Sequence, residues 1–300
     1  MLYINELLEK ALNKPKQRLV VAASDDIEVL QAVKTAVEKE LITPTFVGNV
    51  YNTIELSKQI GFNIEEFELI NSNDITSTAH ISVSLIKNSK ADILMKGIIP
   101  TANLLKIVID KHEGITAGNF LSHIAISQVS TYKKPFAITD CALNIKPNFQ
   151  KKIQILINAV NIMHKLGYSN PKIAIICPIE KENSKIESTI HAAQLTAMNH
   201  EGKITGCQIY GPLALDNAFS TEAANHKGIF NEVVGDADIL LVPDLDSGNI
   251  LYKAINFLVQ GITAAIITGA QCPIVLTSRS DSAENKLYSI ALAVCMANTD

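Results

Sequence analysis

The sequence has little arginine and no tryptophan. Only Arg18 and Arg279 are arginines among 26 basic residues, so lysine carries almost all of the positive charge. The formal net charge at pH 7 is −4, whereas a protein that neutralises nucleic-acid phosphates presents a basic face. We therefore expect no nucleic-acid partner. A chain that uses lysine almost everywhere is expected to keep an arginine where lysine cannot serve.

The sequence also lacks paired cysteines and long apolar segments. Its five cysteines are scattered singly, without a CxxC pair, which is typical of reduced thiols in the cytoplasm. The longest apolar runs are far shorter than the ~18 to 20 residues of a membrane span. Residues 1–6 have neither the basic start nor the apolar stretch of a secretory signal. These features predict a cytoplasmic protein with no membrane partner.

The common catalytic signatures are missing as well. There is no GxGxxG after the first predicted strand, and no GxxxxGK[ST], HExxH or GxSxG motif. The seven histidines are isolated, and none lies at metal-ligand spacing from another histidine or a cysteine. The sequence therefore carries no metal or nicotinamide fingerprint, and we expect no metal and no permanently bound cofactor, although a metal site built from scattered carboxylates stays open.

The pattern that is present is that of an α/β protein. Hydrophobic residues make up 47% of the 300 positions and charged residues 19%, which excludes a disordered chain. Short apolar runs alternate with segments of helical period, which predicts a parallel sheet. About a dozen strands favour two doubly wound lobes, with a crossing point in residues 141–149, although periodicity alone leaves a closed eight-stranded barrel open.

The expected strands are 18–23, 45–47, 67–70, 92–95, 121–129, 136–139, 172–177, 204–210, 238–242, 263–268 and 274–277, and the expected helices are 25–41, 50–60, 75–88, 100–111, 150–166, 185–200, 248–260 and 283–296.

Residues 277–282, before the last predicted helix, combine hydroxyls and an arginine with a helix N-terminus, which is a natural anion site. Ordinary capping, with Asp281 as N-cap and Glu284 three residues later, is the alternative. Capping explains those two residues but leaves Ser278 and Arg279 unexplained. For this pair the pattern favours anion binding.

Three further turns after predicted strands carry polar residues. Lys96-Gly97 directly follows a buried strand, which favours a bound phosphate over a solvated lysine. Asn249 and Lys253 lie four apart on one helix face and can reach a shared ligand, although the turn before them is equally well read as a cap by Asp246 or Ser247. Residues 211–217 are read equally well as a simple turn.

His123, after Ser122, is more often a satisfied core residue than a catalyst. The turns together predict an anion site, for phosphate above all, and favour a phosphoryl or acyl-phosphate enzyme without naming its substrate.

Five groups of residues occur in the order and spacing of one family. They are Lys96-Gly97 with Pro100-Thr101, Leu121-Ser122-His123, residues 211–217, Pro243-Asp244 with residues 248–253, and residues 273–279. On these groups, residues 18–298 resemble the phosphate acetyl/butyryltransferases (phosphotransacylases), and the butyryltransferase branch most closely. Each group alone is a weak signal, and five in register are a strong one.

The resemblance implies a fold and an assembly. The fold is a two-lobed, three-layer α/β/α architecture of the isocitrate/isopropylmalate dehydrogenase-like type, with the active site in the interlobe cleft. The first lobe would comprise residues 1–141 and 268–300 and carry the Ser-Arg site. The second lobe would comprise residues 142–267. A homodimer or a higher homo-oligomer is expected.

The resemblance also implies a reaction: acyl-CoA and phosphate give acyl phosphate and CoA, without a metal. Coenzyme A is then a substrate rather than a cofactor. The expected acyl group is butyryl or a related short or branched chain, with acetyl as the alternative, which places the reaction in short-chain fatty acid metabolism. Two other classes stay open: a metal- and nicotinamide-dependent decarboxylating dehydrogenase, and a non-catalytic small-molecule binding protein.

Residue roles follow from the same resemblance. Arg279, with Ser278 and helix N–H groups, would hold phosphate, and Ser278 or nearby backbone donors would stabilise the oxyanion. The acetyltransferase branch has an aspartate six residues after the arginine, as the base for the CoA thiol, but here that position is Asn285. Asparagine is no base, so the role passes to Glu284, passes elsewhere or is not needed. The expected substrate-binding residues are Lys96, Gly97, Thr101, Ser122, His123, Asp216, Asn217, Asn249 and Lys253.

Overall fold

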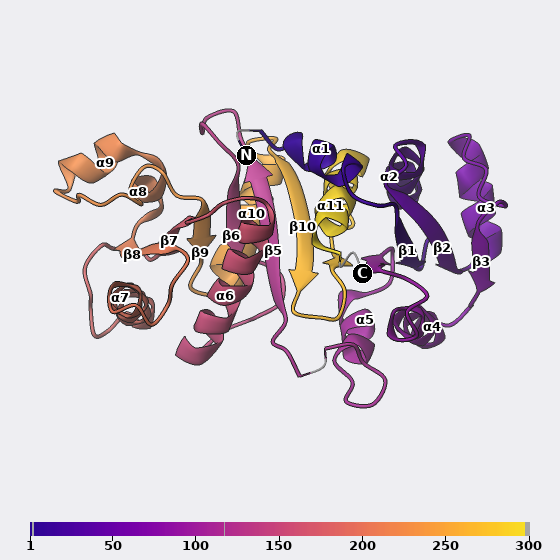
Figure 1. Ribbon diagram of the computed structural model, residues 1–300, viewed down its shortest axis with the longest axis horizontal. Coiled ribbons are helices and arrows are strands. Elements are labelled where there is room, and N and C mark those ends of the chain that lie inside the picture. Colours follow the sequence, from indigo (N-terminus) through magenta and orange to yellow (C-terminus); the bar gives the residue numbers. More distant parts are fainter. Residues whose placement is uncertain (2, 117, 298–300) are drawn as a thin grey trace. The chain divides into compact units, whose positions relative to one another are not determined.

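A computed structural model describes residues 1, 3–116 and 118–297 of the chain, and its elements are labelled in Figure 1. These residues form a mixed α/β fold that divides into two compact units. We call Asn5–Leu121 with Thr263–Asp300 the Arg279 unit. We call Met1–Ile4 with Ser122–Ile262 the His123 unit.

The Arg279 unit is a sheet covered by helices. Its strands, in sheet order, are β3 (Glu68–Asn71), β2 (Ile42–Gly48), β1 (Gln17–Ala22), β4 (Ile93–Lys96), β11 (Ile274–Val275) and β10 (Ile262–Thr268). Its helices are α1 (Glu6–Leu12), α2 (Ile27–Glu38), α3 (Val50–Gln59), α4 (Ile75–Lys87), α5 (Thr101–Val108) and α11 (Ala283–Met296). Neighbouring strands pair in parallel except β10 and β11, which are antiparallel.

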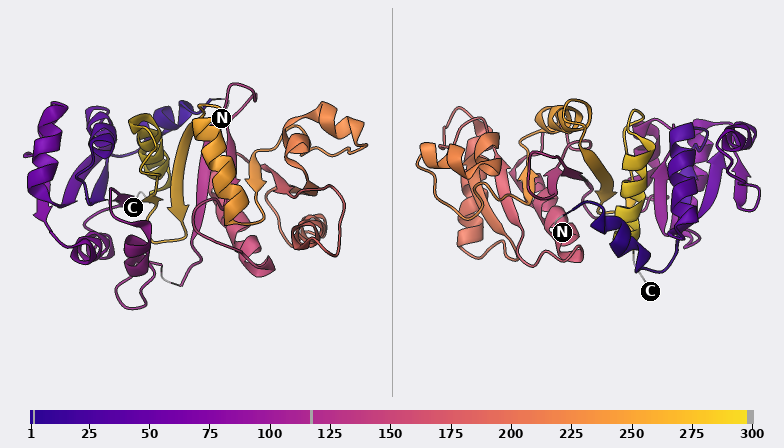
Figure 2. Two further views of the ribbon diagram at one scale, coloured as in Figure 1. Left: turned by 180° about the vertical axis from the view of Figure 1, so that it is seen from behind. Right: turned by 90° about the horizontal axis from the view of Figure 1, so that it is seen from above.

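The strand order places a topological switch between β1 and β4. From β1 the chain moves outward through α2 and α3 to β3, and then returns through α4 to β4. Right-handed crossovers therefore place α2 and α3 on one face of the sheet and α4 on the other. In the structure α11 packs against α1 and α2, and α4 packs against α5 (Figure 2). Ligands of open α/β sheets bind beyond the carboxyl ends of the strands at such a switch.

The two strands beside the switch are buried on both faces. Val20 and Val21 of β1 and Leu94 and Met95 of β4 have no exposed surface. Such continuous apolar runs are typical of parallel strands covered by helices on both sides. The loops that follow β1 and β4 are therefore attached to tightly packed strands.

The strands and helices of the His123 unit lie between Ser122 and Ile262. Its strands, in sheet order, are β5 (Ser122–Gln128), β6 (Phe136–Thr139), β9 (Ile239–Leu241), β7 (Lys172–Ile176) and β8 (Gln208–Leu213). Its helices are α6 (Phe149–Lys165), α7 (Glu187–His200), α8 (Leu215–Phe219), α9 (Thr221–His226) and α10 (Leu245–Phe257). β5 and β6 are antiparallel, and the other pairs are parallel.

Most predicted elements are present, and the differences have local causes. The predicted strand 204–210 is wrong in its first half, because the Asn199 amide of α7 bonds the carbonyls of Ile204 and Cys207, and the strand starts at Gln208. Helices α1, α8 and α9 were not predicted, since five to seven residues are too few to show a helical period. The purely parallel sheet is corrected by the two antiparallel pairs, β5 with β6 and β10 with β11.

The observed units divide the chain at other points than the expected lobes. The expected boundary at residues 141 and 142 assigned β5 and β6 to the first lobe. In the structure, β6 pairs with β9, so both strands belong to the His123 unit, and the chain returns at Thr263 rather than at residue 268. The functional assignment of two lobes stays a prediction.

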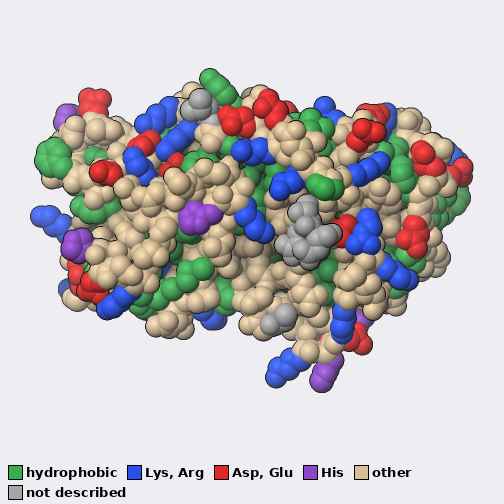
Figure 3. Space-filling view, viewed as in Figure 1, with side chains coloured by type: hydrophobic (Ala, Val, Ile, Leu, Met, Phe, Trp, Pro, Cys, Tyr) green, Lys and Arg blue, Asp and Glu red, His purple; other side chains and the backbone are tan. Residues whose placement is uncertain are grey.

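The surface carries both signs of charge. On the face shown in Figure 3, lysine and arginine side chains are interspersed with aspartate and glutamate rather than gathered in one basic field. Among the described residues, no helix is long and apolar enough to cross a membrane.

Arg18, at the start of β1, makes contacts that lysine cannot copy. Its guanidinium donates to both carboxylate oxygens of Asp92, at 2.8 Å and 2.5 Å, and to the carbonyl of Ser89 at 2.7 Å. A lysine ammonium has no planar fork for such an arrangement. The guanidinium holds the pKa of the Asp92 carboxyl below its usual range, chiefly through this hydrogen bonding. Arg18 thus makes a forked contact of the kind for which an arginine is expected to be kept.

We predict that Arg18→Lys lowers the free energy of unfolding by at most about 1 kcal/mol at pH 7, since the pair is half-exposed. A lowered carboxyl pKa stabilises the fold above the pKa of the unfolded chain, and the effect is lost as the pH falls through the folded-state value. The difference between variant and wild type should therefore shrink below about pH 4. Urea unfolding at pH 7 and pH 3 measures it, and a difference that is as large at pH 3 would contradict this account.

Candidate functional site

The candidate site starts at the switch point, where the loop after β4 lies against the end of β1. The Gly97 N–H donates to the Ala22 carbonyl at 2.8 Å, and the Ile98 N–H donates to the Ala23 carbonyl at 2.9 Å. A Cβ at Gly97 would lie 1.8 Å from the Ala23 oxygen, so only glycine allows this close approach. The two backbones are thus fixed to each other.

Lys96, the last residue of β4, points its ammonium group at the carbonyls of this loop. It is 4% exposed, and its Nζ donates to the Gly97 carbonyl at 2.9 Å and to the Ile99 carbonyl at 3.5 Å. Burial, and then the charges of Arg279 and Lys286, lower the pKa of Lys96 to about 8, while Asp26 and Asp281 oppose the shift. Lys96 is therefore a cation whose charge is costly to keep.

Arg279 reaches the same loop from the other end of the sequence. Its Nη2 donates to the Ile98 carbonyl at 3.0 Å, and the side chain is exposed. A guanidinium has five N–H donors, and this is its one hydrogen bond to the described residues. Lys96 and Arg279 therefore hold neighbouring carbonyls of one loop, and the structure brings together two residues that the sequence analysis selected separately.

The turn that carries Arg279 is shaped by Asp281, and its predicted role as N-cap of the last helix is wrong. The N-cap of α11 is Ser282, whose Oγ accepts the Asn285 N–H. Asp281 is 3% exposed, and its Oδ2 accepts the Ser278 N–H at 2.7 Å. The carboxylate folds back on the turn, because the backbone N–H of Ser278 competes with those of the helix for it.

The predicted help of helix N–H groups in anion binding stays a prediction, although some of these groups already have partners. The Ala283 N–H donates to Glu28 at 3.1 Å, and the Asn285 N–H is taken by Ser282 at 3.2 Å. Two of the first N–H groups of α11 are thus already bonded to side chains. In the same turn, the Ser278 hydroxyl lies 3.0 Å from the Ser280 hydroxyl.

Lys286 is a site residue that the sequence analysis missed. It lies on α11 with 2% of its surface exposed, and its Nζ donates to the Asp281 carbonyl. Burial lowers its pKa, whereas Asp26, Asp281 and Glu28 act in the opposite direction. Its signal in the sequence is a single lysine inside the last helix, where every residue from Asn285 to Met296 is buried.

Two other predicted positions on α11 do not face the loop after β4. Asn285 is buried, and its Oδ1 accepts the Thr263 N–H at 3.0 Å, which ties α11 to β10. Glu284 is exposed and lines a separate hollow with Gln31 and Lys34 of α2. The role of Glu284 as a base stays a prediction.

Thr101 is the first residue of α5. It follows the N-cap residue Pro100, whose side chain makes no capping hydrogen bond.

The residues Ile98, Ile99 and Pro100 line a cavity of about 370 Å³. Residues at or after the ends of β1, β2 and β3 complete its lining. Open space therefore adjoins the loop that Lys96 and Arg279 hold.

The predicted residues of the His123 unit form a second group. His123, at the start of β5, donates its N–H to Asp140 Oδ2 at 3.0 Å, and its Nδ1 lies 3.2 Å from Cys141 Sγ. Ser122 Oγ accepts from Asn158 at 2.9 Å. Both residues are at most 2% exposed, which fits the alternative of satisfied core residues.

Asn249 and Lys253 lie on α10 close to this group. The Asn249 amide donates to the Cys141 carbonyl at 3.2 Å, and Lys253 Nζ lies 5.4 Å from the centre of the Phe257 ring. The N-cap of α10 is Asp244, whose Oδ1 accepts the Ser247 N–H. The proposed caps Asp246 and Ser247 are wrong, because the helix starts three residues earlier than the period predicted.

Asp216 and Asn217 belong to an ion-pair cluster on α8. Lys227 donates to Asp216 at 2.8 Å and to Glu180 at 2.6 Å, and the Asn217 amide donates to the same Glu180 oxygen at 2.8 Å. Lys227 lowers the pKa of both carboxyls through these hydrogen bonds. This cluster gives the two residues a structural role, and their substrate-binding role stays a prediction.

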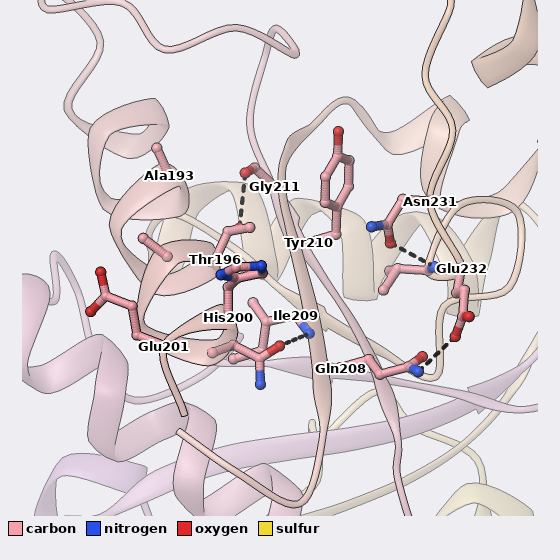
Figure 4. A pocket seen from close by; sticks show the side chains of 13 residues that line it. Ala193, Thr196, His200, Glu201, Gln208, Ile209, Tyr210, Gly211, Asn231 and Glu232 are labelled. Atoms are coloured by element: carbon pink, nitrogen blue, oxygen red, sulfur yellow. Dashed lines mark hydrogen bonds between the residues drawn. The ribbon is translucent and has the colours of Figure 1, made fainter. Parts of the chain in front are cut away.

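A further cavity of about 600 Å³ is lined by Gly211, the first residue of the predicted turn 211–217, but by none of the expected catalytic or substrate-binding residues (Figure 4). It lies between α7 and β8, where Thr196 donates to the Gly211 carbonyl and the Gln208 amide donates to Glu232, while Gln208 Oε1 is buried without a hydrogen-bond partner among the described residues (Figure 4). Within the described part of the chain, no three histidine, cysteine, aspartate or glutamate side chains are placed to hold a metal ion.

Comparison with known proteins gives one family. The family model "Phosphate acetyl/butaryl transferase" matches residues 3–81 and 72–294. The chain is 39% identical to a phosphate butyryltransferase of Clostridium acetobutylicum over 98% of this chain and 97% of that one. It is 42% identical to a probable phosphate butyryltransferase of Bacillus subtilis, over 97% of each chain.

A solved structure is similar as well. A branched-chain phosphotransacylase from Enterococcus faecalis superposes with a TM-score of 0.82 at 34% identity, over 94% of this chain and 100% of that one. The similarity therefore extends over nearly the full length in both sequence and fold.

We predict that Gly97→Ala disrupts the candidate site, because the new Cβ would push the loop away from the Ala23 carbonyl. Overpacking of this kind costs about 1–3 kcal/mol, and the loop carbonyls would no longer meet Arg279. Thermal unfolding and calorimetric titration with inorganic phosphate measure both effects.

The control is Gly61→Ala, where a positive φ of 63° strains the variant but no atom lies within 4 Å of the new Cβ. It should lose stability and keep phosphate affinity. Equal phosphate affinity in the two variants would refute the role of the Gly97 contact.

We predict that Asp281→Ala weakens phosphate binding more than Asp281→Asn. Alanine leaves the Ser278 N–H without its acceptor, a loss of about 1–3 kcal/mol in a buried position, whereas asparagine keeps an oxygen there. Urea unfolding and phosphate titration of both variants test this. If the two substitutions have equal effects, the hydrogen bond to Ser278 does not shape the turn.

Proposed function

Because this chain belongs to the phosphate acetyl/butyryltransferase family, we propose that it transfers a short acyl group reversibly between coenzyme A and inorganic phosphate. Butyryl or a related short or branched chain is the proposed group, since the similar proteins include butyryltransferases and a branched-chain phosphotransacylase. Acetyl is the second candidate. The observation that carries the proposal is the pairing of Lys96 and Arg279 on one loop at the sheet's switch point.

Arg279 is the proposed phosphate clamp. Its guanidinium is exposed and anchored at one nitrogen by the Ile98 carbonyl, so its remaining donors face a ligand in a fixed orientation. A planar fork binds two oxygens of a tetrahedral anion at once, which an ammonium cannot do. The Ser278 hydroxyl supplies a further donor from the same turn.

The proposed reaction is a direct displacement. In the direction of acyl phosphate, a phosphate oxygen attacks the thioester carbonyl, the tetrahedral oxyanion forms, and the C–S bond breaks to release the CoA sulfur. Holding two substrates in attack geometry is worth about 7–11 kcal/mol, and one oxyanion donor about 2.7–4 kcal/mol. Orientation of the substrates therefore lowers the activation barrier more than oxyanion stabilisation does. No covalent intermediate on the protein is needed.

The remaining predicted residues are proposed contacts of the acyl-CoA. Thr101 and Gly97 belong to the Arg279 unit, and the others belong to the His123 unit. In that unit His123 contacts the sulfur of Cys141 and Asn249 donates to its carbonyl, so the two lie close together, which favours them over Asp216 and Asn217. The proposed assembly is a homodimer or higher homo-oligomer in the cytoplasm.

We predict that Arg279→Lys loses most of the activity although it keeps the charge. A single-point ammonium replaces the fork, so kcat/KM for phosphate should fall by about 10²-fold or more, as for loss of one preorganised donor. The measurement is thiol release from butyryl-CoA as a function of phosphate concentration. Arg18→Lys is the matched control, because it makes the same change at a surface pair and should leave the rate unchanged.

We predict that thiol release depends strictly on phosphate and is faster with butyryl-CoA or isobutyryl-CoA than with acetyl-CoA. One methylene in an apolar pocket is worth about 1–3 kcal/mol, so the preference should be about 10-fold or more. Kinetics with the three thioesters measure it. Metal-dependent reduction of a nicotinamide cofactor without thiol release would point instead to the dehydrogenase class.

A further inference from the structure

Any exchange between a thioester and phosphate has to move one proton at sulfur. In the direction of acyl-CoA, the thiol of coenzyme A gives up its proton before or while sulfur attacks the acyl phosphate. A thiol with a pKa near 8.5 is only about 3% ionised at pH 7. A base near the sulfur is therefore useful, and the search for it starts from titratable groups around Arg279.

Two acidic groups near Arg279, Asp281 and Asp26, are already engaged as acceptors of backbone N–H groups. Asp281 is buried and accepts the Ser278 N–H, and Asp26 is the N-cap of α2, where it accepts the Val29 N–H. Glu284 lines a different hollow. Asn285 has no basic atom and bonds to the backbone of β10.

Lys96 fits on geometry. Its Nζ lies against the Gly97 and Ile99 carbonyls, on either side of the Ile98 carbonyl that anchors Arg279. An ammonium has three N–H donors, and two are used by these carbonyls; the third has no partner among the described residues. The carbonyl that anchors Arg279 thus lies between the two carbonyls that hold the Lys96 amine. A ligand bound beside Arg279 would lie close to this amine, whose third hydrogen-bonding position is unused by the described residues.

Burial is the largest cause that lowers the pKa of Lys96, and nearby charges modify the shift. Arg279 and Lys286 are cations near it, and Asp26 and Asp281 are the anions that oppose them. Backbone carbonyls bear only partial charges, so they compensate the buried ammonium incompletely. The resulting pKa of about 8 lies close to that of a thiol, which is the match that general acid–base catalysis uses.

On the basis of the proposed function, we propose that Lys96 exchanges the proton with the coenzyme A sulfur, and that Lys286 is a positioning residue that tunes it. In acyl-CoA formation, neutral Lys96 accepts the S–H proton, sulfur bonds to the acyl carbon, and the bond from that carbon to the phosphate oxygen breaks, so phosphate leaves with the electron pair. In the reverse direction, the Lys96 ammonium returns its proton to the departing thiolate.

The test compares Lys96→Met and Lys96→Arg with two acceptors, coenzyme A and selenocoenzyme A, by phosphate release from butyryl phosphate at pH 7. A selenol is already ionised at this pH and needs no base. Both variants should lose about 10²-fold with coenzyme A, the usual contribution of a general base. Both should remain near the wild-type rate with selenocoenzyme A. The arginine variant keeps a cation at the loop, so the test stands even if the methionine variant does not fold.

Lys106→Met is the control for loss of a lysine, since Lys106 lies exposed on α5 after the same loop. It should leave both rates unchanged. Lys286→Met tests the tuning: with one cation removed, the pKa of Lys96 rises, and the midpoint of the pH profile with coenzyme A should move above the wild-type midpoint. The profile with selenocoenzyme A should not move.

Equal losses with the two acceptors, or a wild-type rate for Lys96→Arg with coenzyme A, would overturn the proton role and leave Lys96 as a support of the loop. An unshifted profile in Lys286→Met would overturn the tuning role. A wild-type protein that releases no phosphate with either acceptor would refute the proposed function itself, which separates that failure from failure of the inference.

Discussion

The candidate site depends on the way one short loop uses its backbone groups. The N–H groups of Gly97 and Ile98 are fixed to β1, so the carbonyls of residues 97–99 are left for side chains, and those side chains are the cations Lys96 and Arg279. Neutral carbonyls orient two positive groups without cancelling their charge. Electrostatic preorganisation of this kind leaves a site that gains most when an anion completes it. The absence of a Cβ at Gly97 is the condition for the arrangement, because the loop cannot approach β1 otherwise.

The scarcity of arginine has a physical meaning in this chain. The Arg18 guanidinium donates hydrogen bonds to the Asp92 carboxylate and to the Ser89 carbonyl. Arg279 donates one hydrogen bond to the Ile98 carbonyl, and its other N–H groups are proposed to bind phosphate. Lysines fill the places where a point charge is enough. Lys286 needs only to meet one carbonyl and to lie near Lys96 in a buried position. The low arginine content therefore drew attention to Arg18, where a forked contact is observed, and to Arg279, where one is proposed.

The alternation of apolar runs and helical periods predicted most of the fold, since buried parallel strands and amphipathic helices have distinct patterns. Helix α11 was predicted at its observed bounds, and the turn before it was selected for Arg279. The pattern could not show that Asp281 would bond to Ser278 rather than cap the helix, because both acceptor geometries start from the same residues. It also missed Lys286, since the burial of a lysine depends on packing between α11 and segments far away in sequence. The assignment of β5 and β6 depended on strand pairing, which periodicity does not contain.

Asn285 shows why a base at that position of α11 would be poorly placed. Its side chain turns toward β10 and accepts the Thr263 N–H, a bond that a carboxylate in the same place would also make. A base at this position would therefore be tied to the sheet unless α11 moved relative to β10. Lys96 differs from Asn285, because its ammonium contacts the loop after β4 rather than β10. It lies there beside Arg279, the group that would hold phosphate. Phosphate clamp and proton acceptor are then joined by a single peptide segment, so a displacement of residues 97–99 would disturb both at once.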